Sequence, residues 1–233
     1  MLASLEWVYW EALSLVVGTL GPVPLSIHTI PTQITMLAFM LPLGLGIALS
    51  VRIGATLPQN VQRAKTLTLA CVVASVVLLG GLSVALYLLR ESFVGLFTSE
   101  LDVMEGCREI WLDVCWFNFI LSFFGINMGI ATGLGMQWTL GWVTVVFMWI
   151  LGLPATYYFA VVKGWGVAAA WKTIWPPYLG INVVIMVAFL WKDWDALSES
   201  IRLREGMEKK SELEGLSLFV DYGSTKDETK PLV

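Results

Sequence analysis

Six long apolar segments decide what this chain can fold into. An α-helix rises about 1.5 Å per residue, so about 20 mainly apolar residues are needed to cross the hydrocarbon core of a bilayer. Inside the bilayer, backbone N–H and C=O groups must be satisfied within the protein, and a helix does this within each segment. The sequence therefore predicts an all-α membrane bundle of six transmembrane helices, over Leu2–Leu20, Ile27–Val51, Leu67–Leu89, Ile110–Leu134, Leu140–Val162 and Val167–Trp191.

The composition favours a membrane bundle over a soluble domain. Of the 233 residues, 57% are hydrophobic and 14% are charged, and the mean hydropathy is +0.75. Soluble domains carry about 25% charged residues. The three cysteines, Cys71, Cys107 and Cys115, show no CxxC spacing and predict neither a disulfide framework nor a zinc site. The sequence indicates no metal site, no cofactor and no basic patch for nucleic acid.

Charge divides the chain into two parts. Of the 32 charged residues, 17 follow Trp191. Residues 1–191 are therefore expected to form the transmembrane lobe, and residues 192–233 a polar cytosolic tail that can begin as a helix but is largely disordered. Arg52, Arg63 and Lys65 fall on the same side of the bundle as this tail. Because basic residues concentrate in cytosolic loops, both termini are expected in the cytosol.

Two acidic residues, Glu6 and Glu11, lie within the first apolar segment. A charged side chain costs at least ~2.5–3.5 kcal/mol at the centre of a membrane helix, so such an acid persists where it faces water, protein or a cation. Glu11 is expected near mid-membrane, ~15 Å along the helix, whereas Glu6 is expected nearer the cytosolic interface, where the alternative is simple hydration. Both are candidates for proton or cation coupling, and Glu11 is expected to carry the larger part.

Aromatic residues surround these acids. Trp7, Tyr9 and Trp10 are candidate substrate-binding residues, because an aromatic face attracts an organic cation by ~0.5–2 kcal/mol. The alternative is that they anchor the helix at the headgroup level. His28, the single histidine, is interpreted as an interfacial residue, with a proton relay as the alternative. Pro42 is a candidate kink in the second segment, because proline removes a backbone donor.

Short motifs along the chain resemble one transporter family. Leu5-Glu6-Trp7 followed by Glu11 resembles the start of the seventh helix of multidrug and toxin extrusion (MATE) antiporters. The matches run in order over residues 5–192, and the resemblance is closest to eukaryotic members. The eighth helix is matched by Met40–Gly46 with Ser50–Gly54, and the turn after it by Leu57–Asn60 with Ala64-Lys65. The turn after the tenth helix is matched by Gly133–Gln137. The eleventh helix is matched by Gly152-Leu153-Pro154, and the start of the twelfth by Lys163–Val167.

The resemblance implies half of a twelve-helix fold. MATE proteins have two similar six-helix lobes, and this chain corresponds to the C-terminal one. Gln33 and Leu121 stand where animal exporters of organic cations carry glutamates, so Gln33 is a candidate substrate-binding residue and the coupling or the substrate charge is expected to differ. Substrate sites in such transporters lie between the repeats. A second lobe is therefore an expected partner, from a homodimer or a separate N-terminal lobe.

Two classes of function remain open. The first is secondary antiport, exporting organic cations and xenobiotics in exchange for protons, with lipid or polysaccharide flippases as a related alternative. The second is a non-transporting half-lobe that acts as a membrane partner or regulator. An enzyme is not expected, because no HExxH, GxSxG or P-loop motif occurs. The expected partners are the lipid bilayer, organic cations and protons, and the expected location is the plasma membrane or a vacuolar or other endomembrane.

Overall fold

The computed structural model describes residues 2–204, 206–207 and 213, and within them the chain forms only helices and the turns between them. The all-α membrane bundle predicted from the sequence is confirmed. Among the described residues, five helices are long and apolar enough to cross a membrane. They are α2 (Pro22–Thr56), α3 (Val61–Leu88), α5 (Leu101–Gly133), the helix Gln137–Val162 and α8 (Gly166–Trp191). The sixth, α1 (Leu2–Gly18), has 17 residues and packs against α2 and α8.

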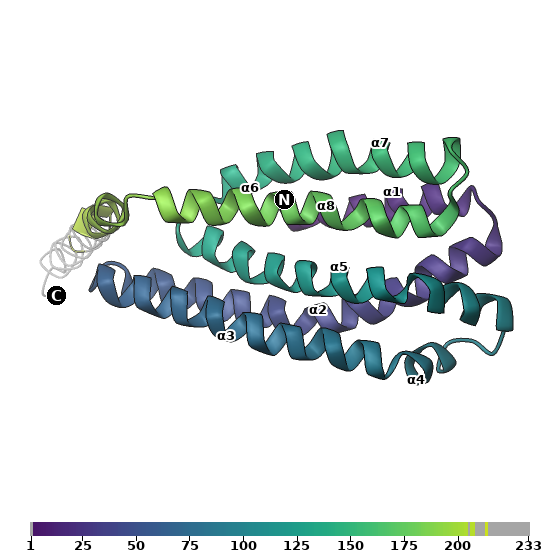
Figure 1. Ribbon diagram of the computed structural model, residues 1–233. Helices are drawn as coiled ribbons and strands as arrows, with labels where there is room; N and C mark the ends of the chain where they lie inside the picture. Colours follow the sequence, from purple (N-terminus) through teal and green to yellow (C-terminus); the bar gives the residue numbers. More distant parts are fainter. Residues whose placement is uncertain (1, 205, 208–212, 214–233) are drawn as a thin grey trace, which may run out of the picture.

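Helix α5 forms the centre of the lobe. In Figure 1 it lies between α2 and α3 on one side and α8, α1 and the α6–α7 helix on the other. Side chains on nearly every face of α5 are buried, including Trp111, Phe117 and Phe124. A helix that is apolar all round belongs in the interior of a bundle. The other helices each leave one apolar face at the surface of the lobe.

Glycines bring α2 and α5 into backbone contact. Gly46 on α2 faces Gly125 and Gly129 on α5, so closely that a Cβ on Gly129 would fall on the Gly46 carbonyl. Small residues spaced by four allow this approach between membrane helices. Pro42 is buried at the same contact, and α2 continues through it as one helix. Its role as a kink therefore stays a prediction.

The fifth membrane helix is continuous but changes its hydrogen-bonding pattern along its length. It consists of α6 (Gln137–Thr144), the π-helical η1 (Val145–Gly152), α7 (Leu153–Thr156) and the π-helical η2 (Tyr157–Val162). Pro154 lies between the π-helical stretches and cannot donate to the α-helical ladder. The Thr156 hydroxyl bonds to the Thr173 hydroxyl at 2.8 Å, which ties this helix to α8.

The longest connection is closed by an ion pair at the surface. After α4 (Arg90–Gly95), the chain turns back into α5. Arg108 donates two hydrogen bonds to the Glu91 carboxylate, from Nε at 3.0 Å and from Nη2 at 2.9 Å. These bonds hold the pKa of the Glu91 carboxyl below its ordinary value of 4.5. The two-pronged geometry fixes the start of α5 against α4.

A helix over residues 194–204 follows α8 and packs against the turn between α2 and α3. Trp194 is buried against Phe189, and the Ser198 hydroxyl donates to the Leu57 carbonyl at 2.9 Å. The Arg202 guanidinium donates to the Pro58 carbonyl. The first part of the expected tail is thus a helix, whereas the disorder expected over most of the tail falls on residues outside those described.

Candidate functional site

A chain of two hydrogen bonds links α1 and α8 at the level of Glu6. The Tyr178 hydroxyl on α8 donates to the Glu6 Oε1 atom on α1 at 3.1 Å. The Trp10 indole N–H donates to the Tyr178 hydroxyl oxygen at 3.0 Å. Tyr178 is fully buried and Glu6 is half-buried. The carboxylate is therefore held in the interior of the lobe by a donor that is itself oriented.

The depth of Glu6 differs from the sequence expectation. Tyr178, its partner, lies twelve residues into the 26-residue helix α8, about 18 Å from the end where α8 begins. Glu6 lies twelve residues before Gly18. The end of α1 at Gly18 packs beside the start of α8. Glu6 is thus level with the middle of α8, whereas counting from the first residue of the apolar segment places it close to one end.

Aromatic rings enclose this hydrogen-bonded chain. The Tyr178 ring lies edge-on to Phe117 and Phe124, with ring centroids 5.2 and 5.3 Å apart. The Trp10 ring lies 5.5 Å from Phe117. These rings come from α1, α5 and α8, so Glu6 faces a largely aromatic core. Aromatic faces next to a carboxylate suit an organic cation, which interacts favourably with both.

Further polar atoms are buried nearby without a protein hydrogen-bond partner among the described residues. They include both ring nitrogens of His28, the Tyr9 hydroxyl and the Trp171 indole N–H. His28 is fully buried, stacked at 6.5 Å on Trp10 and 5.7 Å from Trp171. His28 therefore faces the core of the lobe, and its interpretation as an interfacial residue stays a prediction. Buried polar atoms normally find a partner, so this cluster can accept a water or a polar ligand atom.

The remaining predicted site residues divide between the core and the surface of the lobe. Tyr9, Trp10 and Pro42 are buried, whereas Glu11, Trp7 and Gln33 are exposed on α1 and α2. The structure thus brings Glu6, Tyr9 and Trp10 together, and leaves the other acid outside this cluster. No group of three His, Cys, Asp or Glu side chains suited to a metal ion occurs in the part of the chain that the structure describes.

Tyr178 was not among the sequence candidates, although a signal for it exists. It follows Pro176 and Pro177 in the middle of an apolar segment. A tyrosine at such a depth needs a partner for its hydroxyl. Leu121, where the MATE resemblance implies a glutamate, is fully buried in the same core. The acid missing at that position would have faced the interior of the lobe.

A helical membrane lobe with a hydrogen-bonded acid at its centre is typical of membrane transporters. Comparison with known proteins identifies the family. The MatE family profile matches residues 2–158. The chain therefore belongs to the MatE family, as the motifs had indicated.

Relatives from animals and bacteria share this similarity. Multidrug and toxin extrusion protein 2 of Oryctolagus cuniculus is 24% identical over 213 residues, which cover 90% of this chain and 35% of the rabbit protein. Multidrug and toxin extrusion protein 1 of Danio rerio is 21% identical over 234 residues, covering 99% of this chain and 39% of that protein. The chain thus spans well under half the length of these relatives.

Solved structures show the same fold. The eukaryotic MATE transporter AtDTX14 superposes with a TM-score of 0.81 at 20% identity, covering 86% of this chain and 45% of that one. An inward-facing MATE transporter of the MOP superfamily superposes with a TM-score of 0.68 at 19% identity, over 79% of this chain and 42% of that one. The lobe described here corresponds to slightly less than half of each transporter.

Proposed function

We propose that this chain is one lobe of a proton-coupled antiporter that exports organic cations. Membership of the MatE family and the names of its relatives, which are multidrug and toxin extrusion proteins, support this class of function. The observation that carries the coupling role is the hydrogen bond from Tyr178 to Glu6 inside an aromatic core. A carboxyl group at this depth is stable either protonated or paired with a cation.

Exchange at Glu6 would follow from competition between two ligands. The ionised carboxylate accepts the Tyr178 hydroxyl proton and attracts an organic cation, whose charge the nearby rings also stabilise. Protonation of Glu6 removes that attraction and releases the cation. Proton and substrate therefore exclude one another at one carboxylate, which is the requirement for antiport.

The exposed residues of α1 and α2 would line the path to this carboxylate. Glu11, Trp7 and Gln33 present an acid, a ring and an amide at the surface of the lobe. Exposed polar groups on a membrane helix are costly against lipid and favourable beside water or protein. We assign Glu11 to attracting cations into a cavity that a second lobe completes, and Glu6 to the exchange itself.

A second lobe is part of this proposal. The chain covers 35% and 39% of two animal transporters, which supports a second lobe as the other wall of a substrate cavity. A second copy of this chain or a separate N-terminal lobe would supply it. Both termini would face the cytosol, since Arg52 near the end of α2 and Arg63 and Lys65 in the first turns of α3 lie beside the connection of these helices, and basic residues concentrate on the cytosolic side.

The test replaces one acid at a time in vesicles that hold the chain with a six-helix N-terminal MATE lobe. Efflux of a fluorescent aromatic cation is driven by a pH gradient. Glu6→Gln is expected to abolish the pH-driven flux, whereas Glu11→Gln lowers it partly. Glu91→Gln, in the surface ion pair, is the matched control and keeps the full flux. Unchanged pH dependence in Glu6→Gln would remove Glu6 from the mechanism.

A further inference from the structure

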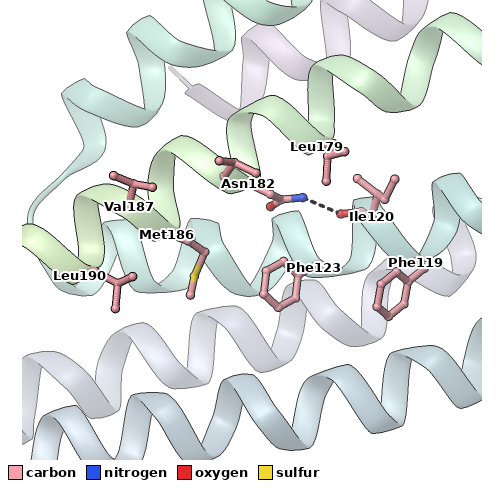
Figure 2. Close-up of a pocket in the computed structure, with 9 residues that line it drawn as sticks. Phe119, Ile120, Phe123, Leu179, Asn182, Met186, Val187 and Leu190 are labelled. Atoms are coloured by element: carbon pink, nitrogen blue, oxygen red, sulfur yellow. Dashed lines mark hydrogen bonds between the residues drawn. The ribbon is translucent and has the colours of Figure 1, made fainter.

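An apolar groove of about 250 Å³ runs between α5 and α8. Figure 2 shows Phe119 and Phe123 of α5 facing Leu179, Met186, Val187 and Leu190 of α8 across it. The one polar side chain in its lining is Asn182, and its amide is already engaged. Its Nδ2 atom donates to the Ile120 carbonyl at 3.0 Å, and its Oδ1 atom accepts from Asn127 at 2.8 Å. The groove therefore offers hydrocarbon contact and no free hydrogen-bonding group.

The groove lies on the opposite side of the lobe from α1 and α2, whose exposed residues Glu11, Trp7 and Gln33 are proposed to line the cation path. In Figure 1, α8, α5 and α3 lie in front of the fainter α1 and α2, which carry Glu11 and Gln33. On the groove side, α8 exposes Leu179, Val183 and Val187. An apolar face of this kind suits lipid chains.

Two opposite charges stand at one end of this groove. Lys172 precedes Leu179 by seven residues, and Asp113 precedes Ile120 by seven, so each lies two turns, about 10 Å, beyond a groove residue on the same helix face. The helices run in parallel, because Phe117 meets Trp171 near one end and Asn127 meets Asn182 further along. Both charges therefore mark the same end of the groove.

The two charges are not closed into an ion pair. Lys172 is exposed and Asp113 is half-buried, and no contact within 4.0 Å joins them among the ion pairs of the described residues. A lysine this far inside a membrane helix extends toward the lipid phosphates. Beside it, Asp113 disfavours a second negative charge and attracts a cation. Glu109, one turn beyond Asp113, adds to that attraction.

We propose that the α5–α8 groove binds a zwitterionic phospholipid from the leaflet where α8 begins. The lipid phosphate contacts Lys172, the ammonium group of choline or ethanolamine contacts Asp113, and one acyl chain lies along the groove. A headgroup with one phosphate and one ammonium matches this charge pair, whereas a purely anionic headgroup meets the repulsion of Asp113. Binding here involves neither Glu6 nor a second lobe.

The test uses the purified 233-residue chain in vesicles of phosphatidylcholine. A trace of phosphatidylcholine carrying a photoactivatable group at the end of one acyl chain is cross-linked, and the labelled peptides are identified. Label is expected on residues 119–123 and 179–190. The same label on phosphatidylglycerol, at equal mole fraction, is expected at a several-fold lower yield. Two results would overturn the proposal. One is equal labelling around α3 and α8, and the other is a yield from phosphatidylglycerol that equals or exceeds the yield from phosphatidylcholine.

Matched variants separate the two charges. Lys172→Gln is expected to lower the phosphatidylcholine yield about fivefold, the factor that corresponds to ~1 kcal/mol for one lysine near the phosphates. Asp113→Asn is expected to remove the preference for phosphatidylcholine over phosphatidylglycerol. Lys163→Gln and Asp102→Asn change exposed charges away from the groove and serve as controls. An Asp113→Asn chain that kept the full preference would refute the role of Asp113, and with it the zwitterionic site.

Discussion

One hydroxyl group, that of Tyr178, holds the candidate site together. It accepts a hydrogen bond from Trp10 and donates one to Glu6, while its ring packs between Phe117 and Phe124. These neighbours are far from Tyr178 along the chain, and Glu6 is 172 residues away. The geometry of the carboxylate therefore depends on a side chain that no local motif connects to it.

Removing this hydroxyl is expected to destabilise the lobe. Tyr178→Phe leaves the buried Trp10 indole N–H without its acceptor and Glu6 without its donor, which costs ~1–3 kcal/mol for an unsatisfied buried group. The free energy of unfolding, measured by titration of micelles with a denaturing detergent, tests this. Tyr157→Phe changes an exposed tyrosine and is the control. Equal stability of the two variants would mean that the hydrogen-bonded chain does not contribute to folding.

Sequence reasoning identified some of these residues and missed others for a physical reason. Glu6 and Glu11 stand out because acids are rare in apolar segments, and Trp10 because it lies beside them. Tyr178 and His28 were missed as buried groups, since both faces of a membrane helix are apolar and hydropathy does not tell the core face from the lipid face. Only the packing of α1 and α8 shows that Glu6 and Tyr178 meet.

Among the elements, the pair α2 and α5 depends on glycine. Gly46 and Gly129 let the two backbones touch, and α2 is the helix that carries Gln33 and His28. Glycines spaced four apart, such as Gly125 and Gly129, are typical of close packing between membrane helices. The sequence could not predict which helix approaches α5, because several other helices present apolar surfaces that could equally pack against its glycines.

A methyl group at this contact is expected to separate the helices. Gly129→Ala places a Cβ on the Gly46 carbonyl, and such overpacking costs ~1–3 kcal/mol. Gly44→Ala, on the same helix as Gly46, adds a methyl group with no atom within 4 Å and is expected to be neutral or stabilising by up to ~1 kcal/mol. Unfolding titrations of both variants give the comparison. A Gly129→Ala chain as stable as Gly44→Ala would show that α2 and α5 adjust without cost.

The helix over residues 194–204 is expected to depend on its contact with the end of α2. Ser198→Ala removes the donor to the Leu57 carbonyl and is expected to destabilise the docked helix by ~1 kcal/mol. Amide hydrogen exchange over this helix is then expected to be about fivefold faster. Ser200→Ala is the control, because the Ser200 hydroxyl bonds only to Leu197 of the same helix. Similar exchange rates in the two variants would show that Ser198 does not anchor the helix.

At the scale of the whole molecule, the sequence was sufficient for the fold class and the family. Apolar segment lengths predict the membrane helices, and ordered motifs over residues 5–192 indicate the MATE fold, which the superposition on AtDTX14 confirms. Details of the helices were less accessible. Segment hydropathy encodes neither the π-helical stretches on either side of Pro154 nor the tertiary contacts that dock residues 194–204.

In the proposed function, this lobe exchanges cations for protons only when a second lobe completes the cavity. This claim is tested most directly by pH-driven efflux of a fluorescent organic cation from vesicles, measured as a function of the number of chains per vesicle. Vesicles holding a single copy are expected to show no flux, and flux is expected to appear only where two copies, or this chain and an N-terminal lobe, share a vesicle. Sustained pH-driven flux from vesicles with one chain each would contradict the claim.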